Sequence, residues 1–232
     1  MIGRLGGLLF LIGSVAQAGQ LASQAALTAA LGGSLITENF NHFSVASGIG
    51  INLTCATLNS SAVCNSQGPG LVVQGINIAF GSGQGQWNGV SYYGSPAQEV
   101  GSHGQPVTVT FTTPVTAFGL NVRAYVGFPA TATVTMLATD NVTVVGTIPN
   151  IVLDSVGGTT TFAGWQNTAG IGAVQITQTG QTYGGPIEAL QFGGTPGGIA
   201  PTTTPAPSTW VLFAIGLAAL GLLQWRRKLL NS

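Results

Sequence analysis

The chain has 232 residues, of which only 4% are charged, and its five Lys and Arg balance its five Asp and Glu. Between Arg4 and Arg226 the only Lys or Arg is Arg123, so one positive and five negative charges give this stretch a formal charge of −4. Nucleic acid is excluded as a partner, because binding to a phosphate backbone needs several cations.

The N-terminus has the pattern of a secretory signal peptide. Arg4 precedes an apolar run over residues 5–15, and Ala16-Gln17-Ala18 supplies the small residues that precede a signal-peptidase cut. The apolar run is too short to cross a bilayer, which takes about 20 helical residues. We predict that residues 1–18 are a signal helix; the alternative is a buried or retained N-terminal helix.

An Ala-rich lead segment is expected at residues 19–34, and strands are expected after it. In Val107-Thr-Val-Thr-Phe111 the apolar residues alternate with Thr, as in a half-buried strand. Similar patterns predict further strands at residues 35–43, 71–74, 76–80, 118–122, 131–136, 142–148, 159–165, 172–179 and 187–192.

These strands are short and are separated by Gly, Pro or Asn, and no long helical pattern lies between Gly32 and Gly194. The combination predicts an all-β fold, an antiparallel β-sandwich over residues 35–193, with an up-and-down barrel as the alternative. We expect the first and last strands to lie close together, because the termini of such domains often do.

The chain has two cysteines, Cys55 and Cys64. An even number of cysteines in an exported chain favours a disulfide bond, which would fix the loop over residues 52–67. The alternative is metal or redox chemistry, but no neighbouring His supports a zinc site at this spacing.

Aromatic residues in polar loops are the candidate ligand-binding groups. Trp87, Tyr92 and Tyr93 lie in a stretch rich in Gly, Asn and Gln, and Trp165 is followed by Gln and Asn. Rings of this kind stack on sugar faces while the amides bind hydroxyl groups. The alternative is that these rings cap the open end of the core, since Trp and Tyr are usually buried.

No catalytic or metal motif is present. His42 and His103 are the two histidines, and neither lies in a nucleophile elbow or a zinc-binding helix motif. We therefore expect no enzymatic activity and no cofactor. The one metal to consider is a structural calcium ion, with Glu38, Asn39 and Glu188 as its candidate ligands if the first and last strands adjoin.

The C-terminal part reads as a linker and an apolar tail. Residues 194–207 are rich in Pro, Thr and Gly, and residues 210–223 are wholly apolar. Arg226, Arg227 and Lys228 follow, and such a cluster stays cytoplasmic, which places the preceding domain outside. From Trp210 to Trp225 a helix covers about 24 Å. We predict a C-terminal transmembrane helix, although length alone would also suit a core helix.

The tail closely resembles the PEP-CTERM sorting signal. The resemblance rests on Pro205, Pro207, Ser208, Thr209 and Trp210, on the apolar helix and on the terminal basic cluster, so that residues 208–228 form the sorting signal. Ala206 stands where that family usually has Glu. The resemblance implies processing by an exosortase-like protease in a Gram-negative bacterium, with the helix initially in the inner membrane. An ordinary C-terminal membrane anchor is the alternative.

The central strands also resemble those of β-sandwich ectodomains in PEP-CTERM proteins, which look like carbohydrate-binding jelly rolls. The similarity is carried by residues 106–119, 138–146 and 187–192 and extends over about residues 36–193. We therefore predict an exported structural or adhesive protein of the cell surface or exopolysaccharide. The alternative is a carbohydrate-binding module that contacts extracellular polysaccharide, and a secreted hydrolase with two dispersed carboxylates is less favoured.

Overall fold

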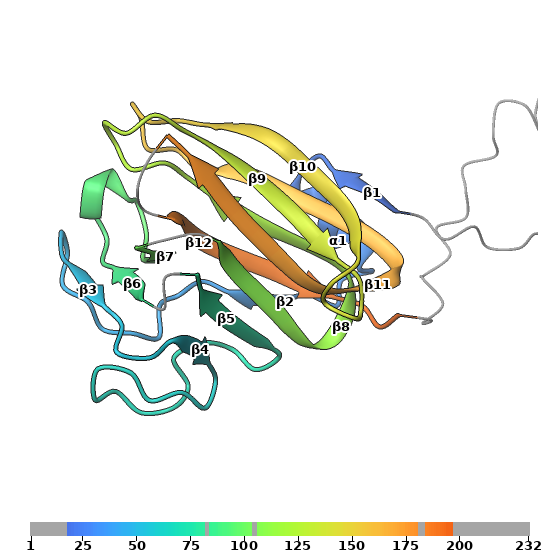
Figure 1. Ribbon diagram of the computed structural model, residues 1–232, viewed down its shortest axis with the longest axis horizontal. Helices are drawn as coiled ribbons and strands as arrows, with labels where there is room; N and C mark the ends of the chain where they lie inside the picture. The colour runs from blue at the N-terminus through green and yellow to red at the C-terminus, as the bar shows by residue number, and fades with distance from the viewer. Residues whose placement is uncertain (1–17, 82–83, 104–105, 181–183, 197–232) are drawn as a thin grey trace, which may run out of the picture. The chain divides into compact units, whose positions relative to one another are not determined.

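The computed structural model describes residues 18–81, 84–103, 106–180 and 184–196 (Figure 1). The chain divides into two units, Met1–Ala200 and Pro201–Ser232, and the described residues all belong to the first. The predicted signal helix and C-terminal helix lie outside the described residues. Within the described residues, no helix has both the length and the apolar character to cross a membrane.

The described part of the chain is mostly antiparallel β-sheet, which confirms the all-β prediction. It contains one α-helix, α1 (Gln24–Ala30), and one 3-10 turn, η1 (Tyr92–Gly94). The strands are β1 (Ala18–Leu21), β2 (Ile36–Glu38), β3 (Gly50–Asn52), β4 (Thr57–Asn59), β5 (Ile76–Phe80), β6 (Gly85–Asn88), β7 (Glu99–Ser102), β8 (Val107–Val122), β9 (Ala130–Leu137), β10 (Val144–Leu153), β11 (Thr161–Thr179) and β12 (Gly184–Gly193).

Two long strands, β8 and β11, run through both layers of the fold. The first half of β8 lies between β5 and the second half of β11, and its second half lies between β12 and the first half of β11. The register shifts between Gln166 and Ala173 mark the point where the pair bends. One layer therefore has the order β4-β5-β8-β11-β9-β10, and the other has β1-β11-β8-β12-β7-β6-β3. The result is sandwich-like.

The main core lies between these layers. Val107 and Val109 point into it with no exposed surface, as their alternation with Thr predicts. Phe111, at the end of the same run, contacts Phe118 and Phe192 of the other layer, with ring centroids 6.4 and 5.2 Å apart. The period-two pattern of β8 thus fixes which face of the strand is buried.

The N-terminal segment covers the outer face of one layer. Ser23 caps α1 by accepting a hydrogen bond from the Ala26 amide, at 3.2 Å, and Leu27 of the helix is fully buried. A side chain at Gly119 of β8 would lie 2.9 Å from Leu27, so the glycine permits this close packing. Residues 18–31, predicted as part of the signal peptide and the lead segment, thus contribute β1 and α1 to the sandwich.

The expectation that the first and last strands lie close together is confirmed, and they pair with each other. In β2 and β12, Glu38 lies opposite Leu190 and Ile36 lies opposite Phe192. The strand predicted at residues 71–74 is wrong, because this segment forms bends and a turn. Leu71 and Val72 are nevertheless buried, and their burial explains the apolar run that suggested a strand. The two strands predicted at 159–165 and 172–179 are one bent strand, β11.

Candidate functional site

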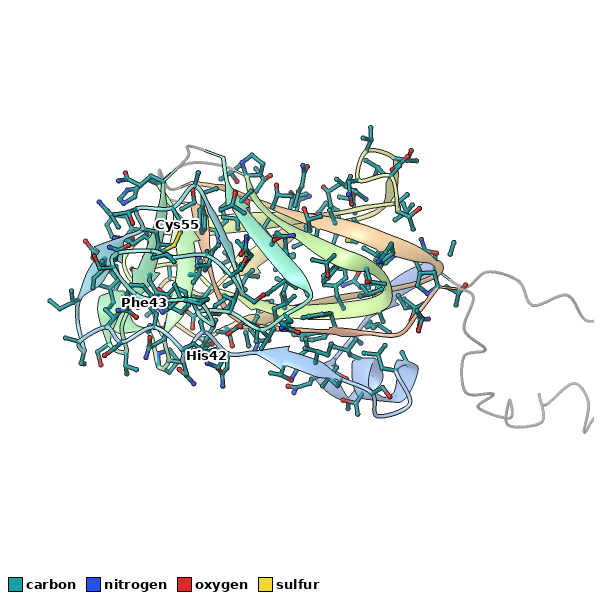
Figure 2. The ribbon with its side chains drawn as sticks, turned by 90° about the horizontal axis from the view of Figure 1, so that it is seen from below. His42, Phe43 and Cys55 are labelled. Carbon is teal, nitrogen blue, oxygen red and sulfur yellow. A yellow bond between two sulfur atoms is a disulfide. The ribbon has the colours of Figure 1, made fainter. Side chains whose placement is uncertain are left out.

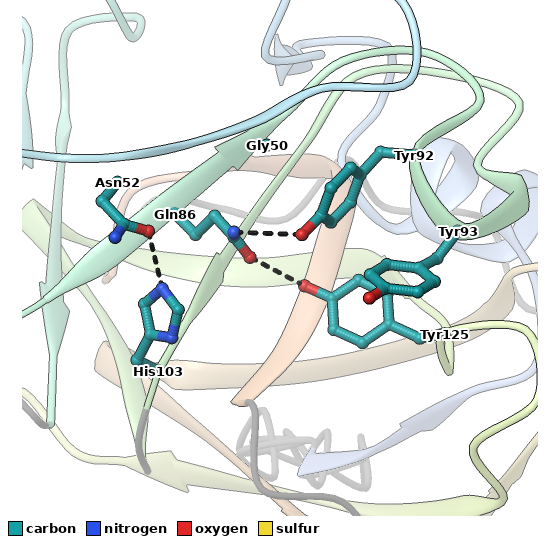
Figure 3. Close-up of a pocket in the computed structure, with 7 residues that line it drawn as sticks. All are labelled: Gly50, Asn52, Gln86, Tyr92, Tyr93, His103 and Tyr125. Carbon is teal, nitrogen blue, oxygen red and sulfur yellow. Dashed lines mark hydrogen bonds between the residues drawn. The ribbon is translucent and has the colours of Figure 1, made fainter.

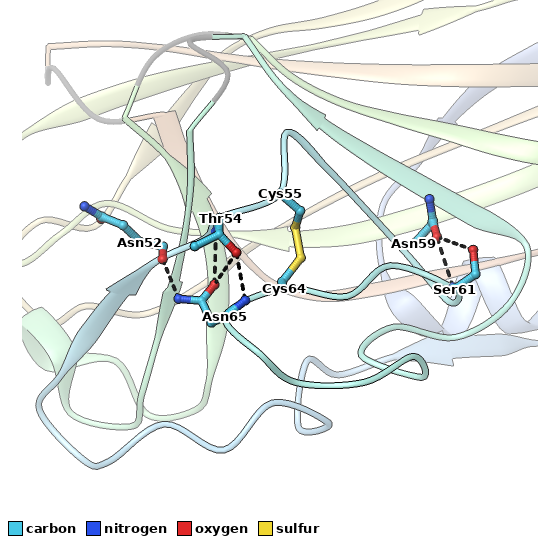
Figure 4. The surroundings of a disulfide bond; sticks show 7 residues. All are labelled: Asn52, Thr54, Cys55, Asn59, Ser61, Cys64 and Asn65. Atoms are coloured by element: carbon cyan, nitrogen blue, oxygen red, sulfur yellow. Dashed lines mark hydrogen bonds between the residues drawn. A yellow bond between two sulfur atoms is a disulfide. The ribbon is translucent and has the colours of Figure 1, made fainter.

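The disulfide between Cys55 and Cys64 is present, which confirms the prediction (Figure 4). The Cα atoms are 5.4 Å apart, and Cys64 is fully buried. The side chain of the next residue, Asn65, makes two hydrogen bonds. Its Nδ2 donates to the Asn52 backbone carbonyl at 2.8 Å, and its Oδ1 accepts from the Thr54 backbone amide at 3.0 Å. The bridged loop is therefore fastened to the end of β3.

A polar pocket lies beside this loop (Figure 3). It lies at the end of the sandwich that contains β3, β6 and β7, whose positions Figure 1 shows. Its volume is about 330 Å³, at the lower end of the range of about 300–1,000 Å³ for ligand sites. We call it the tyrosine pocket, and it is lined by Gly50, Asn52, Gln86, Tyr92, Tyr93, His103 and Tyr125. None of the described residues that line it is Asp, Glu, Lys or Arg.

Hydrogen bonds order the polar groups of the tyrosine pocket (Figure 3). The Gln86 side chain donates to the Tyr92 hydroxyl at 3.3 Å and accepts from the Tyr125 hydroxyl at 3.5 Å. The ring nitrogen Nε2 of His103 lies 2.7 Å from Asn52 Oδ1. Gln86 is nearly buried on β6, whereas Asn52 is exposed at the rim. The pocket therefore has hydrogen-bonded amide and phenol groups inside and the hydrogen-bonded pair of Asn52 and His103 on its more exposed side.

Three tyrosine rings form one wall. The Tyr92 and Tyr93 centroids are 4.7 Å apart in an edge-to-face arrangement, and Tyr93 lies 5.3 Å from Tyr125. Tyr125 is buried, whereas Tyr93 is 49% exposed and presents its ring to solvent. Burial and, next, the charge of Glu99 raise the pKa of Tyr125, so its hydroxyl stays protonated.

The turn that carries Tyr92 and Tyr93 has an unfavourable backbone. Ser91 has φ 67° and Tyr93 has φ 44°, in the left-handed region that residues with a side chain rarely adopt. The guanidinium of Arg123 donates to the Tyr92 carbonyl at 3.0 Å and to the Tyr93 carbonyl at 3.2 Å. These hydrogen bonds hold the turn in a conformation that places both rings at the pocket, and such strain is often found at functional sites.

Arg123 is itself fully buried and paired with Glu99, which is also fully buried. Its Nη2 atom donates to Glu99 Oε1 at 2.9 Å. Asn88 links the pair to the pocket, because its side-chain nitrogen donates to Glu99 Oε1 and to the Tyr125 hydroxyl, both at 3.0 Å. Burial raises the pKa of Glu99, while the hydrogen bond from Arg123 opposes this shift. The ion pair thus forms the support behind the tyrosine wall.

Trp87 does not line the pocket, and the prediction that it stacks on a sugar is corrected. Its side chain has no exposed surface, because β6 is covered on both faces. The Trp87 ring stacks on Phe43 with centroids 5.0 Å apart, and Phe40 meets its edge at 5.8 Å. Phe43 is buried, whereas the preceding His42 is exposed (Figure 2). Trp87 therefore belongs to the core.

Trp165 lies on β11 and is half-buried, away from the pocket-lining residues. Its ring occupies the space beside Gly146 of β10, where an added side chain would come within 2.4 Å of it. Its indole nitrogen is buried and has no hydrogen-bond partner among the described residues. Of the four aromatics singled out from the sequence, the fold brings only Tyr92 and Tyr93 together at the pocket.

Five pocket residues were not identified as a binding site from the sequence: Gly50, Asn52, Gln86, His103 and Tyr125. The sequence could have indicated Gln86 as a binding residue, because it lies in the same polar stretch as Tyr92. Tyr125 follows β8 in a loop, and its neighbours Ala124 and Val126 carry no polar signal. The pairing of β3, β6 and β7 brings Asn52, Gln86 and His103 together, and the loop after β8 adds Tyr125.

The two acids predicted as calcium ligands, Glu38 and Glu188, differ in their surroundings. Glu38 is buried and accepts hydrogen bonds from the Phe40 and Val73 amides. Glu188 is half-buried, and its pKa is raised first by burial and then by the charge of Glu99. Among the residues that the structure describes, no group of three His, Cys, Asp or Glu could hold a metal ion. The calcium site stays a prediction.

The comparisons with known proteins concern the tail. Residues 203–228 match the family model described as the PEP-CTERM protein-sorting motif. The chain carries a PEP-CTERM sorting signal. This motif implies export, sorting to the cell envelope through the C-terminal tail and processing by an exosortase-type enzyme. No curated protein and no solved structure matches the chain. The PEP-CTERM match covers residues 203–228 and does not include the sandwich.

Proposed function

We propose that this PEP-CTERM protein is an adhesive protein of the cell surface whose sandwich binds saccharide without chemical conversion. The tyrosine pocket is the observation that carries the proposal. Sugars present C–H faces that pack on aromatic rings, and their hydroxyls need both donors and acceptors. Tyr93 offers a half-exposed ring, and Gln86 offers an amide fixed by Tyr92 and Tyr125.

A binding role fits this geometry better than hydrolysis. Glycosidases generally use two carboxylates on either side of the scissile bond, whereas the lining of the tyrosine pocket has none. Glu99, which Asn88 links to Tyr125, is buried and hydrogen-bonded to Arg123, Asn88 and Ser95. A carboxylate tied in this way supports the tyrosine wall and does not reach a ligand.

The sorting signal gives the proposed site its location. We propose that the C-terminal helix is held first in the inner membrane of a Gram-negative bacterium, with Arg226, Arg227 and Lys228 on the cytoplasmic side. An exosortase-like protease would then process the tail. The sandwich is thereby delivered to the outer surface or to the exopolysaccharide, where saccharide is the abundant ligand.

The proposal is tested by affinity electrophoresis of the purified full-length chain in gels that contain a panel of bacterial and plant polysaccharides. We expect retardation by at least one polymer. Tyr93→Ala and Gln86→Leu should each weaken that retardation at least about fivefold, which corresponds to ~1 kcal/mol. Gln175→Leu on β11 and Val156→Ala, whose side chain is 86% exposed, are controls outside the pocket lining. Retardation by no polymer would leave a purely structural surface protein.

A further inference from the structure

We propose that the tyrosine pocket selects uncharged saccharides and rejects those that carry carboxylate, sulfate or phosphate groups. This inference rests on the proposed function and specifies the ligand class of the same site. Three observations support it: Arg123 is buried, the groups that line the pocket are amides, phenols and an imidazole, and the stretch between Arg4 and Arg226 has a negative formal charge.

The single Lys or Arg between Arg4 and Arg226 is buried. Arg123 is the only Lys or Arg between Arg4 and Arg226, and its side chain has no exposed surface. Its nitrogen atoms donate to Glu99 and to the Tyr92, Tyr93 and Ala124 carbonyls. No donor of Arg123 is left to bind a ligand anion, and no other Lys or Arg of this stretch could replace it.

The pocket itself is lined by neutral groups. Its polar atoms are the amides of Asn52 and Gln86, the phenols of its three tyrosines and the imidazole of His103. Among the described residues, no Lys or Arg lines the pocket. Amides and phenols donate and accept hydrogen bonds, which suits hydroxyl groups, whereas an anion entering this site loses hydration without gaining an ion pair.

The charge of the whole domain acts in the same direction. One cation and five acids between Arg4 and Arg226 give −4, so an acidic polymer is repelled before it reaches the pocket. Like charges brought together at an interface weaken binding strongly, and salt screens this effect. Binding of an uncharged polymer should therefore depend little on salt.

The test compares matched polymers in affinity electrophoresis at mildly alkaline pH. It uses a full-length chain in which Arg226, Arg227 and Lys228 are replaced by Gln, because this basic cluster would itself bind an acidic polymer. The pairs are hydroxyethylcellulose with carboxymethylcellulose, dextran with dextran sulfate, and galactan with polygalacturonate. We expect binding to at least one neutral polymer and at least about tenfold weaker binding to its charged counterpart. Equal or tighter binding to the charged member overturns this inference and leaves the proposed function standing. Binding to no polymer, charged or neutral, overturns the proposed function as well.

A gain-of-charge variant tests the physical cause. Asn52 is exposed at the rim, so Asn52→Lys adds a cation at the mouth of the pocket. Asn41→Lys adds the same charge at an exposed position outside the lining. We expect Asn52→Lys to narrow the preference for the neutral polymer several-fold more than Asn41→Lys does. Equal effects of the two variants would overturn the claim that the missing cation in the pocket sets the selectivity.

Discussion

The buried pair of Arg123 and Glu99 gives the sharpest prediction about stability. In Arg123→Met the guanidinium is lost, and a fully buried carboxylate at Glu99 stays without its charged partner. Removing one member of a buried ion pair costs about 3–5 kcal/mol, a large part of the roughly 5–15 kcal/mol that stabilises a typical domain. We expect a loss of this size in urea unfolding, followed by tryptophan fluorescence.

Two further variants separate the charge from the packing. In Arg123→Met/Glu99→Gln the unpaired charge is gone, so the double variant should be at least about 1 kcal/mol more stable than Arg123→Met alone. Thr177→Met, at an exposed position of β11, is the surface control and should stay within about 0.5 kcal/mol of the wild type. A double variant no more stable than Arg123→Met would refute the reasoning that an uncompensated charge is the cause.

The same pair also predicts a pH effect. Burial raises the pKa of Glu99 above its ordinary value of 4.5, so the folded chain binds the proton more readily than the unfolded chain. Stability from this group is fully present below the unfolded pKa and is lost as the pH rises through the folded pKa. Arg123 lowers this pKa, so its removal raises the folded pKa of Glu99 further. The loss of stability in Arg123→Met relative to the wild type should therefore shrink as the pH falls toward 4.5. A deficit that grows on acidification would contradict this sign.

Three other predictions concern the pocket, the disulfide and an acidic turn. Gly50→Ala places a methyl group 2.7 Å from Tyr92 and should weaken saccharide binding in affinity electrophoresis. Gly68→Ala, which has open space around it, is the control and should leave binding unchanged. Equal effects of the two variants would contradict the assignment of the pocket as the binding site. Replacing Cys55 and Cys64 with Ser should lower the free energy of unfolding in urea by about 2–3 kcal/mol, and no change would contradict a stabilising bridge. Hydrogen bonds from backbone amides and a hydroxyl lower the pKa of the exposed Asp154 to about 2, so its stabilisation is present above pH 3.8 and is lost as the pH falls toward 2. Thermal unfolding of D154N should accordingly depend less on pH in this range, and an unchanged dependence would contradict it.

The sequence predicted the fold where burial has a simple period. Val107 and Val109 alternate with polar residues because one face of β8 meets the core, and this pattern identified the strand. The apolar pattern failed at Leu71 and Val72, which are buried without forming a strand. Apolar character reports burial, and the backbone hydrogen bonds that define a strand depend on a partner distant in sequence.

Only part of the candidate site could be predicted from the sequence, because most of its residues meet through contacts between segments distant in sequence. Tyr92 and Tyr93 lie in a polar turn and could be singled out locally, but the same reasoning selected Trp87, which the double-sided cover of β6 buries. Gln86 and Tyr125 join the pocket only because β3, β6 and the loop after β8 meet in space. Nothing near Arg123 in the sequence shows that it supports the tyrosine turn through backbone carbonyls.

The central claim is that the tyrosine pocket is a saccharide site, and fluorine NMR tests it most directly. The full-length chain, labelled with fluorotyrosine, is titrated with the neutral polymer that retards it most strongly, and single Tyr→Phe variants assign the signals. We predict saturable shifts of the Tyr92 and Tyr93 signals, with smaller shifts for Tyr125, whose ring is buried. Saturable binding that leaves all three signals unmoved would contradict the account.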